Sequence, residues 1–330
     1  MAFFGHRSPN SVGPPGGNGE PGDPPQFGDE PDETDPTTLD TDGVPRGQGV
    51  VDSLVELLDL ERVEDNLYRG VSPELSPVRV FGGQVAAQAL VAAGRTVPED
   101  REVHSLHAYF IRPGDPAVPI VYETERVRDG RSFTTRRVLA IQHGVPIFAL
   151  SASFQLAQTG LQHTQPAPVG VPAPDTLPGL DALASSAGAR WLTQGPRPLD
   201  MRFVSPPPWS DEFAGASEEP ARVWIRADGS LPDDRLLHVC MLTYVSDLTL
   251  LGSVLVRHDR AEGPVQMASL DHAMWFHRPF RADEWLLYTC HSPFAGGGRG
   301  LATGRFTTAD GTLVATTVQE GLVRVPRHAG

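Results

Sequence analysis

The sequence contains no lysine, so all 27 basic residues of the 330-residue chain are arginines. Schiff-base catalysis and the phosphate-binding lysine of a P-loop both require an amine, which arginine cannot provide. The formal charge of −14 argues against nucleic-acid binding, because phosphate binding requires a concentrated basic surface and no basic stripe is visible. These absences exclude three large classes of protein.

Cysteines and long apolar runs are also scarce. Cys240 and Cys290 are the only cysteines; they lie in apolar surroundings without CxxC spacing and are expected to be small core residues. No run approaches the roughly 18 apolar residues needed to span a bilayer. Residues 1–7 are followed by Pro and Gly rather than by the apolar core of a signal peptide. We therefore expect a cytoplasmic protein that does not insert into a membrane.

Several common catalytic motifs are missing. No GxSxG occurs, so the nucleophile elbow of the α/β-hydrolases has no candidate serine. No HExxH occurs, and the 11 histidines form no cluster with cysteines at zinc-binding spacing. We therefore predict neither a metal site nor another cofactor.

The first 47 residues differ in composition from the rest of the chain. They contain nine Pro, nine Gly and nine acidic residues, against two arginines. Such a segment cannot bury enough apolar surface to offset the entropy lost on ordering. We predict a disordered acidic tail over residues 1–47.

The next part of the chain predicts a helix at 51–60 and an alanine-rich helix at 85–93 that is apolar on nearly all faces. Gly94 is the predicted C-cap of the second helix. Strands are predicted at 104–111, 119–128, 133–142 and 146–155. A buried helix followed by antiparallel strands indicates a sheet wrapped around that helix.

A similar unit follows residues 157–190, whose Gln, Pro, Gly and Ala content predicts a linker. Its predicted elements are a strand at 223–226, an apolar helix at 236–251, and strands at 267–277, 285–291, 300–308 and 313–324. SLHAYFIRP at 105–113 also parallels SLDHAMWFHRP at 269–279. Because one unit used twice explains this similarity, we predict an α+β fold of two tandem domains, 48–156 and 191–326.

Three polar residues in apolar elements are candidates for chemistry. An ionised Asp247 in a core costs on the order of several kcal/mol unless it is paired, although it could instead lie on a solvated stripe or bond Ser246 or Thr249. Gln319 interrupts an apolar strand and could bind water or an anion, or could simply point outward. Ser269 carries an end-of-strand hydroxyl that is unremarkable alone.

Five motifs resemble the acyl-CoA thioesterase II (TesB-type) family over residues 51–324. They are VFGGQ at 80–84, YFIRPGD at 109–115, SDL at 246–248, DHAMWFHRP at 271–279 and TVQEG at 317–321. The resemblance implies a double hot-dog fold, with each antiparallel sheet wrapped around a central helix. It also implies an enzyme of fatty acid metabolism that hydrolyses acyl-CoA to free fatty acid and CoA without a cofactor.

In this family an Asp, a Thr or Ser, and a Gln hold the attacking water. The matching residues are Asp247, Ser269 and Gln319; bacterial relatives often have Thr in place of Ser269, but the hydroxyl is retained. Gly82 and Gly83, at the start of a buried helix, are expected to let backbone N–H groups approach the substrate. The sequence does not assign which of the two buried helices faces the thioester carbonyl. Hot-dog proteins generally pack through their sheets, which implies a homo-oligomer.

Two other functions remain open. A hot-dog enoyl-CoA hydratase normally needs a close Asp and His pair, but the residue five positions beyond Asp247 is Gly252. A non-catalytic acyl-CoA-binding protein would hold the thioester without cleaving it, since a fold does not fix function. Release of free CoA would distinguish a thioesterase from both.

Overall fold

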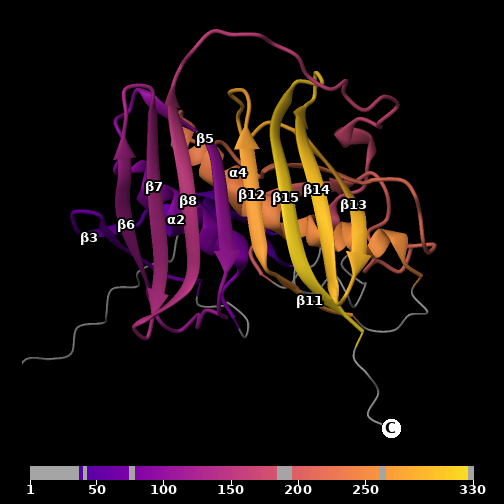
Figure 1. The fold of residues 1–330 in the computed structure, drawn as a ribbon. Coiled ribbons are helices and arrows are strands. Elements are labelled where there is room, and N and C mark those ends of the chain that lie inside the picture. Colours follow the sequence, from indigo (N-terminus) through magenta and orange to yellow (C-terminus); the bar gives the residue numbers. More distant parts are fainter. Residues whose placement is uncertain (1–36, 40–42, 74–78, 184–194, 260–264, 326–330) are drawn as a thin grey trace, which may run out of the picture. The chain divides into compact units, whose positions relative to one another are not determined.

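The computed structural model describes residues 37–39, 43–73, 79–183, 195–259 and 265–325. A 13-stranded antiparallel sheet dominates this part of the chain (Figure 1). In spatial order its strands are β3 (Glu61–Glu64), β4 (Leu67–Gly70), β6 (Ile120–Asp129), β7 (Phe133–Gln142), β8 (Val145–Leu156), β5 (Arg101–Phe110), β12 (Asp271–Phe276), β15 (Leu313–Arg324), β14 (Arg299–Thr308), β13 (Leu286–Gly296), β10 (Ala221–Ala227) and β9 (Leu199–Phe203), with β11 (Gln266–Ser269) also paired to β15.

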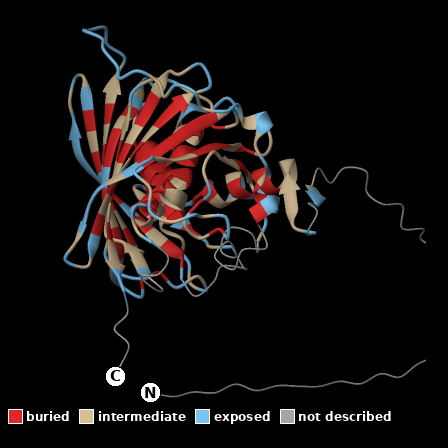
Figure 2. Cartoon of the chain, turned by 90° about the vertical axis from the view of Figure 1, so that its right-hand side faces the viewer, coloured by how far each residue is buried: buried red, intermediate tan, exposed pale blue. Residues whose placement is uncertain are grey.

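Two helices, α2 (Gly82–Gly94) and α4 (Arg235–Thr249), pack against one face of this sheet, and buried residues concentrate between the helices and the strands (Figures 1 and 2). Every residue of α2 from 83 to 94 is buried, which confirms the prediction from its apolar composition. A shorter helix, α1 (Gln48–Leu58), contacts α2, and the 3-10 helix η4 (Leu251–Arg257) continues from α4. Cys240 and Cys290 are free and buried, as predicted.

α2 and α4 run antiparallel in close contact. A Cβ atom at Gly83 would lie 2.4 Å from the backbone oxygen of Tyr244, near the end of α4. At the other end, a Cβ atom at Gly94 would lie 2.5 Å from Leu236. The prediction that Gly94 is the C-cap is therefore wrong: Gly94 is the last residue of α2, Arg95 is the cap, and the glycine makes room for the neighbouring helix.

The two repeated sequence segments meet at the centre of the sheet. β5 pairs antiparallel with β12, with Ser105 opposite Trp275 and Tyr109 opposite Asp271. Equivalent strands of the two units are therefore neighbours, and the units share one continuous sheet rather than forming two separate ones. This pairing covers an edge that each unit would otherwise expose.

The long strands agree with the sequence prediction, and those at 133–142 and 313–324 agree at both ends. The predicted strand 267–277 is instead two strands, β11 and β12, which are separated at Leu270. The short strands β3, β4 and β9 were not predicted. All four residues of β3 are exposed, so it lacks the alternation that identifies a half-buried strand.

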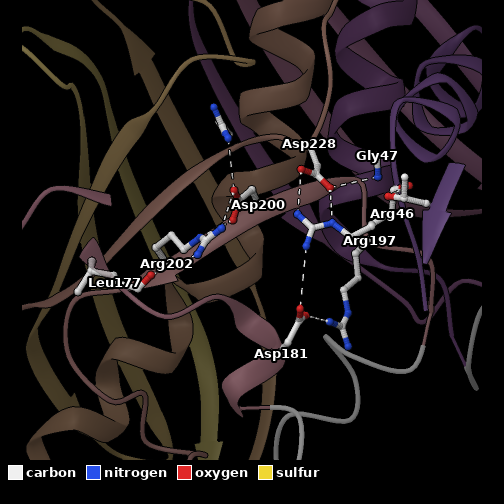
Figure 3. Close-up of polar contacts among 10 residues, drawn as sticks. Arg46, Gly47, Leu177, Asp181, Arg197, Asp200, Arg202 and Asp228 are labelled. Atoms are coloured by element: carbon white, nitrogen blue, oxygen red, sulfur yellow. Dashed lines mark hydrogen bonds and ion pairs between the residues drawn. The ribbon is translucent and has the colours of Figure 1, made fainter. Parts of the chain in front are cut away.

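The predicted tail includes ordered residues. β1 (Thr37–Leu39) pairs with β2 (Pro45–Gly47), so the prediction of disorder is wrong for these residues, while residues 1–36 lie outside the described part of the chain. Arg46 explains the order: its Nε and Nη2 donate to the Asp228 carboxylate at 2.9 and 3.2 Å (Figure 3). Asp181 forms ion pairs with both Arg46 and Arg197, so this network also joins the predicted linker to the C-terminal half.

The predicted linker is not a purely exposed segment, because its later part contains short helices and two buried residues. Residues 157–166 are exposed, but the 3-10 helices η1 (Pro174–Thr176) and η2 (Leu180–Leu183) follow, and Leu180 and Leu183 are buried. Trp224 Nε1 of β10 donates a hydrogen bond of 2.9 Å to the Pro172 oxygen. Residues 184–190 of this segment lie outside the described residues.

One helical stretch, Arg235–Arg257, is long and apolar enough to cross a membrane by length and composition. No such stretch was expected from the sequence. Because 61% of its most apolar window is buried inside the protein, and core helices pass the same test, this stretch is weak evidence for a membrane span.

Candidate active site

Asp247 lies in the last turn of α4, where that helix meets the start of α2. A Cβ atom at Gly82 would lie 2.6 Å from Asp247 Oδ2, so the carboxylate can take this position only because residue 82 is a glycine. The backbone N–H of Gly83 donates a hydrogen bond to Asp247. Phe81 provides no side-chain cap for α2, so Asp247 caps this helix from outside and its charge lies at the positive end of the helix dipole.

Ser269 and Gln319 both donate hydrogen bonds to Asp247 Oδ1. The distances are 3.1 Å from Ser269 Oγ and 2.5 Å from Gln319 Nε2. Gln319 Nε2 also lies 3.0 Å from Ser269 Oγ. The structure thus brings together, from α4, β11 and β15, the three residues that the sequence analysis selected, and Gln319 points inward rather than outward.

The break between β11 and β12 turns Ser269 toward Asp247. Met274 and His272 of β12 point inward and are buried. Regular alternation would place Leu270 inward and Ser269 outward. Instead, the pairing with β15 shifts by one residue across Leu270, so that the Ser269 hydroxyl reaches the interior. Such irregularities re-aim side chains next to active sites.

Burial raises the pKa of Asp247 from 3.8 to about 6, because the carboxylate loses hydration. Hydrogen bonds from Gln319, Ser269 and Gly83 stabilise the ionised form and partly offset this rise. At neutral pH the carboxylate is therefore mostly ionised, but it is a stronger base than an exposed aspartate.

Asp247 and Ser269 line a cavity of about 910 Å³. Its volume is that of a small-molecule site. Gln319 is absent from the described wall; its side chain is fully buried, and its amide oxygen has no hydrogen-bond partner among the described residues. A buried acceptor without a partner is costly. We therefore expect a hydrogen-bond donor such as water at the Gln319 amide oxygen, beside the base Asp247.

Two histidines of the second unit, His272 and His277, make no hydrogen bond to Asp247. His272 Nε2 lies 2.8 Å from Ser246 Oγ, and burial lowers the pKa of His272 to about 4. His277 Nε2 lies 2.8 Å from Thr316 Oγ1. No group of three or more metal-binding side chains occurs in the part of the chain that the structure describes.

One wall of the cavity was not predicted from the sequence. Phe203, at the end of β9, packs edge-on against Trp209 with ring centroids 5.5 Å apart, and both line the cavity. Residues 206–208 between them are three consecutive prolines, which have no backbone N–H to donate within an α-helix or a β-sheet. This proline run followed by an aromatic residue was the available signal.

Comparison with known proteins gives the family. Residues 196–322 match the model described as "Acyl-CoA thioesterase", and residues 72–155 match "Acyl-CoA thioesterase N-terminal domain". Human "Acyl-coenzyme A thioesterase 8" is 43% identical over 284 residues, covering 82% of this chain and 88% of that protein. The chain belongs to the acyl-CoA thioesterase family.

Solved structures similar to this acyl-CoA thioesterase family member confirm the fold. Acyl-CoA thioesterase II TesB2 from Mycobacterium marinum is 49% identical with a TM-score of 0.70, over 82% of this chain and 98% of that one. A hot-dog protein of unknown function from Alicyclobacillus acidocaldarius has a TM-score of 0.68 at 20% identity, over 83% and 98% of the two chains. The predicted α+β fold of tandem hot-dog domains is therefore confirmed, while the domain boundaries stay predictions.

Proposed function

We propose that this chain hydrolyses acyl-CoA to free fatty acid and CoA by direct attack of a water molecule that Asp247, Ser269 and Gln319 activate. Membership of the family makes the chain an acyl-CoA thioester hydrolase. The observation that supports this mechanism is the Asp247 carboxylate, which lies on the wall of the large cavity with Ser269 and Gln319 donating to its Oδ1.

In the proposed reaction Asp247 accepts a proton from water while the water oxygen bonds to the thioester carbonyl carbon. Oδ1 already accepts two hydrogen bonds, so Oδ2, on the side of Gly82, is the oxygen available for the proton. The tetrahedral intermediate then collapses, the carbon–sulfur bond breaks, and the proton passes from Asp247 to the CoA thiolate. No covalent bond to the protein is required.

The start of α2 is the proposed site of oxyanion stabilisation. The sequence suggested both Gly82 and Gly83 as donors to the substrate; because the N–H of Gly83 already interacts with Asp247, we propose Gly82 as the donor. At the first position of a helix, Gly82 has no acceptor within α2, and its N–H lies at the positive end of the helix dipole. Such a preorganised donor stabilises developing negative charge.

The geometry offers less support to the two alternatives. A hydratase would need a histidine paired with Asp247, whereas the hydrogen-bond partners of Asp247 among the described residues are Gly83, Ser269 and Gln319. A purely binding protein would have no need of a base with a raised pKa in its cavity. Hydration of crotonyl-CoA without thiol release, or tight acyl-CoA binding without thiol release, would support one of them instead.

Thiol release from acyl-CoA tests the mechanism in Asp247→Asn, Gln319→Ala and the double variant. Because both residues act on one water, the double variant should lose less activity than the product of the two single losses. Losses that multiply independently would contradict a shared water, and undiminished thiol release in both single variants would remove the trio from the reaction.

A further inference from the structure

Two exposed arginines, Arg79 and Arg112, line the cavity from two chain segments that pack together. Arg79 precedes Val80, whose N–H donates to the Gly114 oxygen at 3.0 Å, and Arg112 lies two residues before Gly114. A Cβ atom at Gly114 would lie 2.9 Å from the Val80 side chain, which shows how closely these two segments pack. Arg79 and Arg112 both line the cavity, and both are exposed.

Neither arginine has a carboxylate partner among the described residues. Within the described ranges the Arg112 side chain makes one hydrogen bond, from Nη1 to the Pro146 oxygen at 2.6 Å. Asp115 is the nearest acid along the chain, but it accepts from the Ala117 N–H and lies 3.7 Å from His143. Most other arginines in the described part of the chain form ion pairs, so two guanidinium groups without a carboxylate partner, on segments that pack together, mark a local positive region on a chain with a formal charge of −14.

Beyond Asp247 the cavity wall is largely apolar, although Phe81 and Phe110 also line the part near Arg79 and Arg112. From Asp247 the wall follows α4 into η4, where Leu251 and Leu255 line it. A Cβ atom at Gly321 of β15 would lie 2.4 Å from Leu251, so this end leads away from α2 toward the C-terminal strands. Phe203 and Trp209 complete an apolar end that suits a hydrocarbon chain.

One more arginine lines the cavity, but it differs from the first two. Arg222, in β10, is paired with Glu219 at 3.9 Å, and a quarter of its side chain is exposed, against 78% for Glu219. Its charge is thus partly compensated before any ligand binds. Arg222 therefore provides a matched control, because it lies on the same cavity but belongs to the apolar end.

We propose that Arg79 and Arg112 bind the phosphate groups of the CoA moiety, which places the thioester at Asp247 and directs the acyl chain toward Leu251, Leu255 and the Phe203–Trp209 pair. This orientation rests on the proposed function. Guanidinium groups bind phosphate through paired N–H donors, and a local positive region attracts a polyanion that the net negative charge of the chain would otherwise repel.

The test compares two substrates with the same acyl group, acyl-CoA and S-acyl-pantetheine, which has the thioester arm but no phosphate. In R79Q/R112Q, the KM for acyl-CoA should rise about ten-fold or more with little change in kcat, because charge-assisted hydrogen bonds to phosphate are lost. Turnover of S-acyl-pantetheine should not change. In R222Q, the ratio of kcat/KM for the two substrates should stay at its wild-type value.

Salt provides a second readout that does not depend on the variants' stability. For the wild type, kcat/KM on acyl-CoA should fall with rising ionic strength, whereas turnover of S-acyl-pantetheine should not. An equal loss on both substrates in R79Q/R112Q, or a selective loss on acyl-CoA in R222Q, would overturn the proposed orientation. Failure of the proposed function looks different, because the wild type would then release thiol from neither substrate.

Discussion

Gln319 donates a hydrogen bond of 2.5 Å to Asp247, although the two residues lie 72 positions apart in the chain. Gln319 is held by the β14–β15 pairing and Asp247 by the contact between α4 and α2, so the site depends on the sheet and the helices together.

Asp247→Asn should reduce kcat by about 10² to 10⁴ while the protein stays folded, because a positioned general base contributes this much and Asn cannot accept the proton. The loss should appear in kcat more than in KM, since proton transfer is needed in the transition state and not for holding CoA. Steady-state thiol release and circular dichroism check both parts. If the variant keeps more than about a tenth of wild-type kcat, Asp247 is a structural acid.

The rate should fall with decreasing pH through about 6, because burial raises the pKa of Asp247 to that value and only the ionised form is a base. The residual rate of Asp247→Asn should not fall in this way at low pH. The measurement is the pH dependence of kcat for the two proteins. If the variant shows the same fall in kcat below about pH 6 as the wild type, another group is responsible for the titration.

The same raised pKa predicts the sign of a stability effect. A carboxyl group whose pKa is higher in the folded than in the unfolded state binds its proton more tightly when folded. The contribution of Asp247 to the free energy of unfolding should therefore decrease as the pH rises from 3.8 to about 6. A shift of this size corresponds to about 3 kcal/mol. Relative to the wild type, Asp247→Asn should therefore gain stability over this interval in urea titrations, and a relative loss would contradict the raised pKa.

Ser269→Thr should keep appreciable activity because the hydroxyl is retained. Ser269→Ala should lower kcat by an amount corresponding to about 1 kcal/mol or more, since Asp247 loses one donor and Gln319 loses an acceptor. Thiol-release rates of the two variants at equal enzyme concentration provide the comparison. Equal rates would make Ser269 an ordinary strand residue.

Gly82→Ala should impair catalysis because the added Cβ atom would lie 2.6 Å from Asp247 Oδ2 and 2.7 Å from Phe110. Displacement of the carboxylate should lower kcat about ten-fold or more, since small misplacements of reacting groups are costly. Gly160→Ala is the matched control, because a Cβ atom there meets nothing within 4 Å. A Gly82→Ala enzyme with wild-type kcat would show that the close approach has no catalytic importance.

Arg46→Ala should lower the free energy of unfolding by about 1 kcal/mol, because it removes two hydrogen bonds to Asp228 from a partly exposed ion pair. Arg62→Ala removes an exposed ion pair with Asp65 and should have a smaller effect. Urea unfolding of both variants gives the comparison. Equal effects would show that β2 is not anchored through Arg46.

The sequence by itself determined the regular elements that carry strong apolar patterns. The helices at 82–94 and 235–249 follow from near-continuous apolar composition, and the strands at 133–142 and 313–324 follow from residue types and turn signals. Asp247 was already recognisable as an acid in an apolar helix. These features are local, so neighbouring residues suffice to specify them.

Only the tertiary structure decided how these residues meet. The one-residue shift at Leu270 turns Ser269 inward, and the absence of a side chain at Gly82 lets the end of α4 approach the start of α2. Likewise, Arg46 belongs to a segment whose composition predicts disorder, yet Asp228, 182 positions away, anchors it. Each of these contacts joins residues that are distant in the chain, and the local pattern of residues does not specify such contacts.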